Sequence, residues 1–542
     1  MKMTGAQAII KAFEAENVEI VFGLPGAAIC PFYDAVTESK IKNILIRQEQ
    51  AAVHAASGYA RVTGKVGVCI ATSGPGATNL VTGIATAHMD SIPIVAITGQ
   101  VLLAHIGKDA FQEADITGAT LPFTKHNYLV KDVNDIPRVI KEAFHIASTG
   151  RPGPVLIDIP VDVQLKEFDF EYPKTVNLRG YKPTTKGHIR QIEKVAQAIE
   201  KAKQPVILAG GGIITANASQ ELRELVKICN IPVTTTLMSK GCMPKDSGLD
   251  LGMLGSHGVY IANYAVNNAD LIIVMGARVS DRAVGNAGVI GKKTKVIHID
   301  IDPAEIGKNI DTLIPVVGDI KYILKELLKI AKGNDNREWI DKINETKKAH
   351  VKKPDFDKNG EFVNAKHFLD ILSEKVKEGT IVSTEVGENQ IWTANHFKIG
   401  TPRVFLTSGG LGTMGFGFPA AIGAKFAKPD KTVIAIEGDG SFQMNFNELG
   451  TVMQNHLGIK IVVFNNHRLG MVREYQKVHY NCNYCGVFLE ENPDFVMLAK
   501  AYGFNGEKIS KNSEIEGAIE RMLADDKTYM LEIEVDPFED TL

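Results

Sequence analysis

Short apolar runs alternate with amphipathic, helix-like stretches along the whole of this 542-residue chain. Strands that are buried on both faces of a parallel sheet form such continuous apolar runs, and the covering helices repeat apolar residues every three or four positions. The alternation therefore predicts open, mostly parallel α/β sheets covered by helices. The runs that predict strands are 20–22, 44–46, 66–71, 94–98, 155–159, 205–208, 231–235, 271–275, 296–299, 380–384, 433–437, 459–465 and 530–534.

Two breaks in this pattern divide the chain into three predicted domains. The segment 166–187 is polar and rich in Lys, Pro and Thr, and 333–364 is strongly charged, so both are interpreted as linkers. The predicted domains are then 1–165, 188–332 and 365–542. The first and third share the same alternation, which either a duplication or the frequent recurrence of this layered design explains.

Composition narrows the class of protein. Hydrophobic residues at 44%, charged residues at 23% and a net charge of −3 are typical of a globular protein without electrostatic preference for a polyanion. Nucleic acid and membrane surfaces are therefore not expected as partners. The N-terminus has an amphipathic helix pattern without a signal peptide, and no apolar run approaches the roughly 18 residues needed to span a bilayer. We expect a cytoplasmic protein.

Six cysteines are too few for a disulfide framework in a chain of this length. Cys482 and Cys485 have CxxC spacing, but a zinc site needs two further ligands and no second CxxC or HxxxH lies nearby. Reduced cysteines are the favoured interpretation.

The strongest chemical signal is a predicted strand that runs into GDGSFQMNFNELG, followed by a second strand that ends in Asn465 and Asn466. The carboxyl ends of parallel strands form a ligand crevice, where small residues let backbone amides approach phosphates. Gly438, Gly440 and Ser441 supply that approach. The Asp439 carboxylate and an Asn466 amide oxygen are hard ligands that suit Mg²⁺ on a diphosphate.

With this motif the chain resembles the thiamine-diphosphate enzymes, whose GDG and NN are separated by a spacer of this length. The resemblance implies that Asp439, Asn466 and the backbone carbonyl of Arg468 hold the magnesium ion. It also implies that Glu49, in RQEQAAVHAASGYAR, activates the cofactor. By the residues alone, a Glu near a helix start is usually a solvated charge.

Further matches concern the loop TSGGLGTMGFGFPAAIGA, which leads into a tightly packed helix. The resemblance makes Met414 the apolar residue that wedges the cofactor into a bent shape, with Gly412 beside it. Gly26 and Ala27 match a loop that approaches the cofactor. By the residues alone, Met414 would be core filler.

Within this superfamily, the chain from Thr4 to about Asp536 is similar to the acetolactate synthase catalytic subunits. The shared stretches include SGPGATNL, DAFQEADI, TKHNYLVKD and GRPGPVLIDIP. The resemblance implies a pyrimidine-binding first domain, a central FAD-binding domain and a diphosphate-binding third domain. It implies that pyruvate is decarboxylated and its two-carbon unit joined to a second pyruvate or to 2-ketobutyrate, the first common step of branched-chain amino acid biosynthesis.

The resemblance also implies further site residues. Gln112, Phe111 and Met471 match active-site positions, and Arg282 matches the position that contacts the acceptor carboxylate. A structural FAD would be held by Arg151, Gly210, Gly211, Gly212, His257, Arg278, Asp300 and Asp319. Without the resemblance, the AGGG run would be interpreted as a turn, because it lacks the full GxGxxG fingerprint.

The family supplies its activating Glu from a partner subunit, which implies a homodimer or homotetramer, and family members often bind a small regulatory subunit. This chain departs from the usual pattern at Leu24, Leu102, Val161, Val279, Ser280 and Tyr475. The change at Tyr475 weakens the expected preference for 2-ketobutyrate. Glyoxylate carboligase, a simple 2-keto acid decarboxylase and a non-catalytic paralogue are the alternatives; Glu49 argues against the first.

Overall fold

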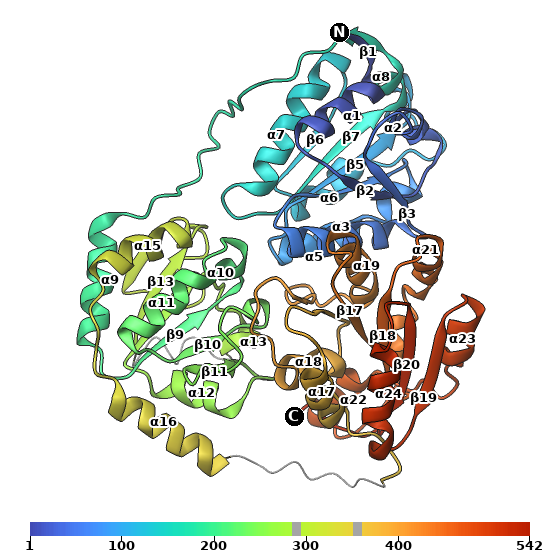
Figure 1. Cartoon of the computed structure of the whole chain (residues 1–542). Helices are drawn as coiled ribbons and strands as arrows, with labels where there is room; N and C mark the ends of the chain where they lie inside the picture. Colours follow the sequence, from blue (N-terminus) through green and yellow to red (C-terminus); the bar gives the residue numbers. More distant parts are fainter. Residues whose placement is uncertain (285–293, 351–359) are drawn as a thin grey trace.

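The computed structural model describes residues 1–284, 294–350 and 360–542. Within these ranges, three sheets of six strands form the main units, and all neighbouring strands in them are parallel. Helices cover both faces of each sheet (Figure 1). The predicted fold class is confirmed. Positions 351–359 of the predicted second linker, and Gly285 at the end of GARVSDRAVG, lie outside the described residues.

The first sheet has the order β3-β2-β4-β5-β7-β6. The helix that opens the chain begins with a capping box, in which the Thr4 hydroxyl accepts from the Gln7 N–H at 3.3 Å. The strands are β2 (Ile20–Gly23), β3 (Lys42–Leu45), β4 (Gly67–Ala71), β5 (Ile94–Gln100), β6 (His126–Leu129) and β7 (Pro154–Pro160). The longer helices around them are α1 (Gly5–Ala15), α3 (Glu49–Thr63), α5 (Val81–Met89) and α7 (Ile136–Ser148), with the short α6 (Ile116–Thr120).

The third sheet has the order β16-β15-β17-β18-β20-β19. Counted along the chain, both this sheet and the first place their strands second, first, third, fourth, sixth, fifth, so the two domains share one topology. The strands are β15 (Ile381–Thr384), β16 (Phe405–Leu406), β17 (Val433–Gly438), β18 (Ile459–Asn465), β19 (Asn505–Ile509) and β20 (Tyr529–Glu534). The helices include α17 (Ala365–Lys375), α18 (Glu388–His396), α19 (Gly417–Ala427), α20 (Asp439–Phe442), α21 (Leu449–Gln454), α22 (Gly470–His479), α23 (Phe495–Ala501) and α24 (Ile515–Leu523).

The middle sheet differs, with its strands in the order third, second, first, fourth, fifth, sixth. This is the order of doubly wound dinucleotide-binding sheets, whose ligand lies where the order reverses. The strands are β9 (Pro205–Ala209), β10 (Val233–Thr235), β11 (Asp250–Met253), β12 (Leu271–Met275), β13 (Lys295–Asp300) and β14 (Ile314–Val317). The covering helices include α9 (Ile189–Lys201), α10 (Gly211–Thr215), α11 (Ser219–Cys229), α12 (Tyr260–Asn268), α13 (Asp281–Val284) and α15 (Ile320–Ile330).

Part of the segment predicted as the second linker is helical. Helix α16 (Arg337–His350) packs on the middle domain, where Trp339 is 2% exposed and donates its indole N–H to the Pro205 carbonyl at 3.2 Å. The charges of this helix lie on its outer side, so its composition resembles that of a linker. By contrast, an extended segment does run from the first domain to the middle domain between β7 and α9 (Figure 1).

Helices α3 and α19 bring the first and third domains into close contact (Figure 1). An added Cβ at Gly58 would lie 2.1 Å from the Ala420 carbonyl oxygen, and one at Gly423 would lie 1.8 Å from the Ala55 carbonyl oxygen. Each helix thus places a glycine against the backbone of the other. This reciprocal contact fixes the orientation of the two domains relative to each other, and with it the direction in which each crevice opens.

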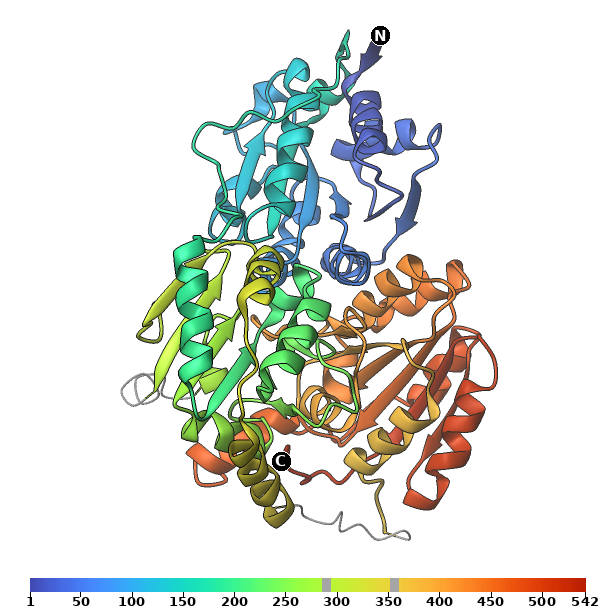
Figure 2. The same cartoon turned by 60° about the vertical axis from the view of Figure 1, so that its left-hand side comes forward.

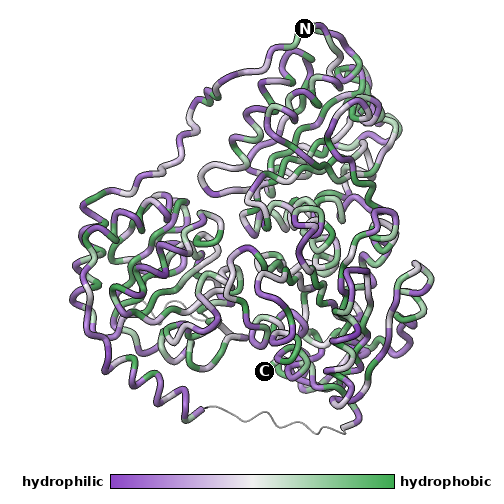
Figure 3. Tube along the Cα trace, in the orientation of Figure 1, coloured by the Kyte–Doolittle hydropathy of each residue, from purple (hydrophilic) through white to green (hydrophobic). Residues whose placement is uncertain are grey.

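Apolar residues concentrate in the strands and in the helix faces turned toward them (Figure 3). A second view shows the three domains arranged around a common centre (Figure 2). All six cysteines are free, and Cys482 and Cys485 are exposed. In the described ranges, no helix is long and apolar enough to cross a bilayer, and no cluster of three or more His, Cys, Asp or Glu could hold a metal ion.

Candidate active site

The GDG and NN motifs meet at the carboxyl ends of two neighbouring strands. Strands β17 and β18 pair in parallel up to Gly438 and Phe464, and Asp439 follows as the first residue of α20. The Asp439 carboxylate is 2% exposed and accepts a 2.7 Å hydrogen bond from the Asn492 amide, which also donates to the Asn465 amide oxygen at 2.9 Å. Burial raises the pKa of Asp439 to about 6.

Asn466 is oriented by two partners. Its amide nitrogen donates to Glu388 at 2.7 Å, and its amide oxygen accepts from the Arg468 N–H at 3.1 Å. Three oxygen groups therefore lie on adjoining turns: the Asp439 carboxylate, the Asn466 amide oxygen and the Arg468 carbonyl. Oxygen ligands of this kind suit Mg²⁺. The residues present fit the implied ion.

Side chains pack closely on the two glycines in the floor of this crevice. An added Cβ at Gly440 would lie 2.7 Å from a Leu469 methyl carbon, and one at Gly438 would lie 2.9 Å from the Asn389 amide nitrogen. The Ser441 hydroxyl donates a hydrogen bond to the Gly438 carbonyl at 3.2 Å. Backbone amides at the start of α20 can thus be approached closely, as a diphosphate requires.

Glu388 is a residue that the sequence analysis missed. It is 4% exposed, contacts Asn466, and lies 3.4 Å from the Arg473 guanidinium, which is itself 1% exposed. Burial raises the pKa of Glu388 to about 8, against the lowering effect of Arg473. The signal that could have revealed it is its place at the start of α18, directly after strand β15, which neighbours β17.

A buried pair of carboxyl groups lies beneath the glycine-rich loop. Glu385 and Glu437 are both fully buried, and burial together with their mutual repulsion raises the pKa of Glu437 well above its usual value. Glu385 accepts from the Gly415 and Gly417 N–H groups at 2.8 Å each. Glu385 therefore holds the part of the loop that directly follows half-buried Met414. The repulsion between the two carboxylates favours protonation of one of them.

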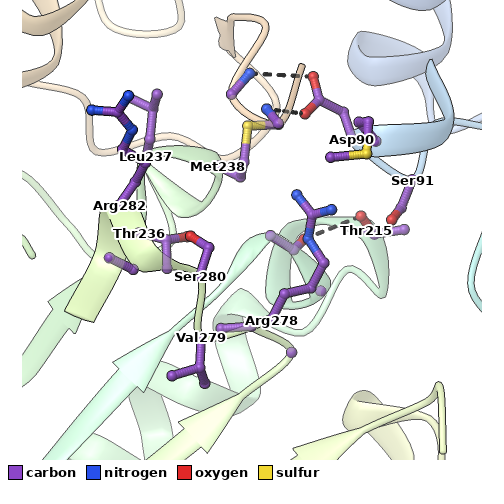
Figure 4. Close-up of a pocket in the computed structure, with 18 of the residues that line it drawn as sticks. Asp90, Ser91, Thr215, Thr236, Leu237, Met238, Arg278, Val279, Ser280 and Arg282 are labelled. Atoms are coloured by element: carbon purple, nitrogen blue, oxygen red, sulfur yellow. Dashed lines mark hydrogen bonds between the residues drawn. The ribbon is translucent and has the colours of Figure 1, made fainter. Parts of the chain in front are cut away.

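A cavity of about 620 Å³ lies between the three domains. Most residues expected to contact FAD line it, and so do three expected near the reacting groups. The predicted FAD residues in its lining are Arg151, Gly211, Gly212, His257, Arg278, Asp300 and Asp319, and the others are Arg282, Gly412 and Met471. Figure 4 shows Arg278 and Arg282 projecting from the middle domain, with Asp90 entering from the first domain.

The glycine run at the end of β9 has a packing role. The Gly210 and Gly212 N–H groups donate to the Met275 and Gly276 carbonyls at 2.9 and 3.0 Å. An added Cβ at Gly210 would lie 2.1 Å from the Gly276 oxygen. These glycines let the loops after β9 and β12 cross where the strand order reverses, and Gly210 itself lies just outside the cavity lining.

Charges in the cavity are partly compensated. The Arg151 guanidinium lies 2.8 Å from Glu305 and 3.3 Å from Asp302. Burial lowers the pKa of Arg278 and raises that of Asp300 to about 6. Asp319 caps α15 by accepting from the Tyr322 N–H at 2.9 Å. The cationic side chains of Arg151 and Arg278 lie near a glycine-rich turn at the place where the strand order of the middle sheet reverses. This arrangement fits the diphosphate of a dinucleotide such as FAD.

Glu49, Gly26 and Ala27 form a separate cluster at the carboxyl ends of β2, β3 and β4. Glu49 is 6% exposed, begins α3 and accepts from the Asn79 amide at 2.9 Å. An added Cβ at Gly26 would lie 2.5 Å from Thr72, and Ala27 follows it. Neither Glu49 nor Gln112 is among the described residues that line the cavity between the three domains.

Comparison with known proteins finds a family match in each of the three domains. Three family models match: thiamine pyrophosphate enzyme, N-terminal TPP binding domain, over 3–119; the central domain over 192–327; and the C-terminal TPP binding domain over 385–533. The chain is 51% identical to the "Probable acetolactate synthase large subunit" of Methanocaldococcus jannaschii, over 99% of this chain and 93% of that one.

Two further relatives are the "Acetolactate synthase large subunit" of Corynebacterium glutamicum and the "Acetolactate synthase isozyme 2 large subunit" of Escherichia coli K12. The first is 47% identical over 96% of this chain and 84% of the relative, and the second is 44% identical over 99% and 96%. This chain belongs to the acetolactate synthase large subunit family. The resemblance inferred from the motifs is confirmed.

Of the departures from the acetolactate synthase family pattern noted in the sequence, two lie at exposed positions and one has a strained backbone. Tyr475 on α22 is 54% exposed and Leu102 is 38% exposed. Val279 has a φ of 50°, which a β-branched side chain rarely adopts, and the Asn309 amide bonds to its carbonyl at 3.2 Å. The backbone that leads from Arg278 toward Arg282 is thus held in a strained turn.

Proposed function

We propose that this chain is an acetolactate synthase catalytic subunit, which decarboxylates pyruvate and joins the remaining two-carbon unit to a second pyruvate or to 2-ketobutyrate. The observation that carries the proposal is the 43–51% identity to acetolactate synthase large subunits over nearly the whole chain. The three matching TPP enzyme domains support thiamine diphosphate as the cofactor. The comparisons favour this reaction over the glyoxylate carboligase alternative.

In this proposal, Asp439, Asn466 and the Arg468 carbonyl hold Mg²⁺, and amides beside Gly438 and Gly440 receive the diphosphate. Bound thiamine diphosphate supplies the electron sink that lets a 2-keto acid lose carbon dioxide. Glu388 keeps the Asn466 amide oxygen turned toward the ion by accepting from its nitrogen. The Glu385 and Glu437 pair keeps the loop beside Met414 and Gly412 in place.

We assign the middle cavity to FAD in a structural role. Its support is the strand order of a dinucleotide-binding sheet, the crossing glycine loops and the lining residues Arg151 and Arg278. Arg282 and Met471 also line this cavity, which supports an acceptor keto acid site next to the FAD. A guanidinium is the natural bidentate partner of the acceptor carboxylate.

A second copy of the chain would complete the active site. Glu49 lies in a first-domain cluster and Asp439 in a third-domain crevice, and the described contacts of Glu49 stay within the first domain. Exposed apolar side chains support a partner surface, among them Phe111 at 88% and Val478 at 68% exposure. We therefore propose a homodimer or homotetramer. The relatives' designation as large subunits supports a small regulatory partner.

Product analysis tests the reaction. Purified protein receives thiamine diphosphate, Mg²⁺ and FAD with pyruvate, 2-ketobutyrate or glyoxylate, alone and in pairs. We expect acetolactate from pyruvate, and loss of it in a Glu49→Gln variant that still binds the cofactor. Tartronate semialdehyde or free aldehyde in place of acetolactate would overturn the proposal, and so would unchanged turnover by Glu49→Gln.

Co-expression tests the shared site. Glu49→Gln and Asp439→Asn chains should each be inactive alone, because each lacks one half of the site. If sites form between chains, mixed dimers contain one intact site, and about a quarter of the wild-type activity should return. No recovery in verified mixed dimers would place both residues in one chain's site.

A further inference from the structure

The loop that carries Gln112 has an unusual backbone. Asp109 and Gln112 have φ values of 54° and 58°, a left-handed conformation that residues other than glycine rarely adopt. An added Cβ at Gly74 would lie 2.8 Å from the Gln112 carbonyl oxygen, so the SGPG turn presses directly on this residue. Such a backbone persists only where its surroundings hold it.

The loop closes on itself through Glu113. This carboxylate accepts from the Gly107 N–H and, at 2.9 Å, from the Ala110 N–H. Asp115 then caps α6 by accepting from the Gly118 N–H at 2.8 Å. These bonds shape the loop, but they do not join it to the sheet.

The junction with the sheet is a buried chain of hydrogen bonds. Asp158 on β7 is 2% exposed and accepts from the Gln100 amide at 2.9 Å and from the Thr98 hydroxyl at 2.7 Å. The same Gln100 amide nitrogen donates to the Ala114 carbonyl at 2.8 Å. Gln100 is 4% exposed, and its oxygen accepts from the Val101 N–H at 2.9 Å, so both ends of its amide are engaged.

A carboxylate suits this place because it only accepts hydrogen bonds. It requires the Gln100 nitrogen to face it, and that orientation leaves the second amide hydrogen for the Ala114 carbonyl. Burying the charge is costly, and burial raises the pKa of Asp158 to about 7, with Asp115 across the turn adding to the effect. On the neighbouring strand β6, the apolar residue Leu129 pairs with Asp158.

We propose that Asp158 and Gln100 are positioning residues for the reaction, which anchor the loop 107–115 so that Gln112 and Phe111 stand over the substrate. This rests on the proposed function. Phe111 is 88% exposed in the single chain, and the loop projects from the first domain. A displaced loop would leave the reacting groups open to water, so that the two-carbon unit is protonated and released as aldehyde instead of joining the acceptor.

The test compares Gln100→Met with Asn336→Leu in the cofactor-loaded enzyme. The Asn336 amide donates to the Cys229 and Asn230 carbonyls at 3.0 Å each, so this control loses two buried bonds far from the loop. We expect Gln100→Met to lower kcat/KM at least tenfold and to raise the aldehyde fraction of product. Asn336→Leu should melt earlier without changing that fraction.

A second measurement covers the case in which Gln100→Met folds poorly. Trypsin can cut the loop after Lys108, and Asp158→Asn should speed this cleavage several-fold, whereas Gln112→Ala should raise the aldehyde fraction without faster cleavage. Equal cleavage rates and an unchanged aldehyde fraction in both anchor variants would overturn the inference. Absence of acetolactate from the wild-type enzyme would instead overturn the proposed function.

Discussion

The contact between α3 and α19 gives a sharp test of the fold. A Gly423→Ala substitution adds a Cβ 1.8 Å from the Ala55 carbonyl oxygen, 2.7 Å from its carbon and 3.0 Å from the Ala55 Cα. An ordinary carbon–oxygen contact is about 3.3 Å, so the new methyl group is roughly 1.5 Å too close. The Ala55 atoms belong to the backbone, and the position of the new Cβ is fixed by the backbone of α19. No side-chain rotation can therefore relieve the contact, and the helices must separate.

Overpacking of a well-packed core costs about 1–3 kcal/mol, and the rigidity of both partners favours the upper end. A gap of even about 1 Å also forfeits up to half of the dispersion energy across the interface. At roughly 2–4 °C per kcal/mol for a unit of 150–250 residues, we expect Gly423→Ala to lower the Tm of the third domain by about 6–12 °C. Acetolactate formation should fall as well, because the first and third domains no longer meet correctly.

The matched control is Gly517→Ala in α24, where the nearest atom to the new Cβ is the flexible Arg521 guanidinium at 3.1 Å. This variant should match the wild type or gain up to about 1 kcal/mol of helix propensity. Gly58→Ala makes the reciprocal clash, and the double variant should cost less than the sum of the two, because the helices have already separated. A Gly423→Ala protein that melts within about 1 °C of wild type would refute the reasoning.

Four further outcomes are expected. His54 is fully buried and its pKa is lowered to about 3 by burial and by Arg61, so only the unfolded chain takes up its proton between about pH 6.5 and 3. Stability should fall by about 1.4 kcal/mol per pH unit as the pH drops through that window, and His54→Leu should flatten the slope of Tm against pH. The Asp90 carboxylate lies 2.6 Å from Arg61 and accepts from the Gly410 N–H at 2.7 Å, so Asp90→Ala should cost about 3–5 kcal/mol of unfolding free energy by leaving a buried guanidinium unpaired. Calorimetry that finds under about 1 kcal/mol would contradict this. Tyr475→Trp should raise the ratio of 2-ketobutyrate to pyruvate as acceptor by about tenfold, measured in competition, since one methylene of discrimination is worth about 1–3 kcal/mol; an unchanged ratio would remove Tyr475 from the acceptor pocket. Chelation of Mg²⁺ should abolish activity and release thiamine diphosphate on gel filtration, with recovery on adding Mg²⁺, whereas retained activity would exclude Asp439 as an essential ligand.

Strands in the middle of each sheet could be predicted from the sequence, because burial on both faces makes them continuous apolar runs. The run 271–275 matches β12 residue for residue. The edge strand β3 was predicted in part by the run 44–46, but other edge strands were missed. Strand β6 is half exposed, and its His126–Leu129 segment carries no such run. Helix α16 was missed because its charged outer face resembles a linker.

At the site, the motif residues on adjoining loops could be predicted, but their partners could not. Asn492 reaches Asp439 from 53 residues away in sequence, through a loop without a motif of its own. Glu388 precedes Asn466 by 78 residues. Only the order of strands in the sheet brings these groups together, and a single sequence does not state that order.

The interlock of α3 and α19 also bears on how the chain is made. Helix α3 is buried along nearly its whole length, yet its partner begins about 350 residues later. At about 5–20 residues per second, a ribosome needs roughly 20–70 s to complete that interval. During this time the nascent first domain exposes the Ala-rich face of α3 around Gly58, which α19 does not yet cover. Chaperone engagement should therefore peak before α19 emerges, and the first domain expressed alone should aggregate.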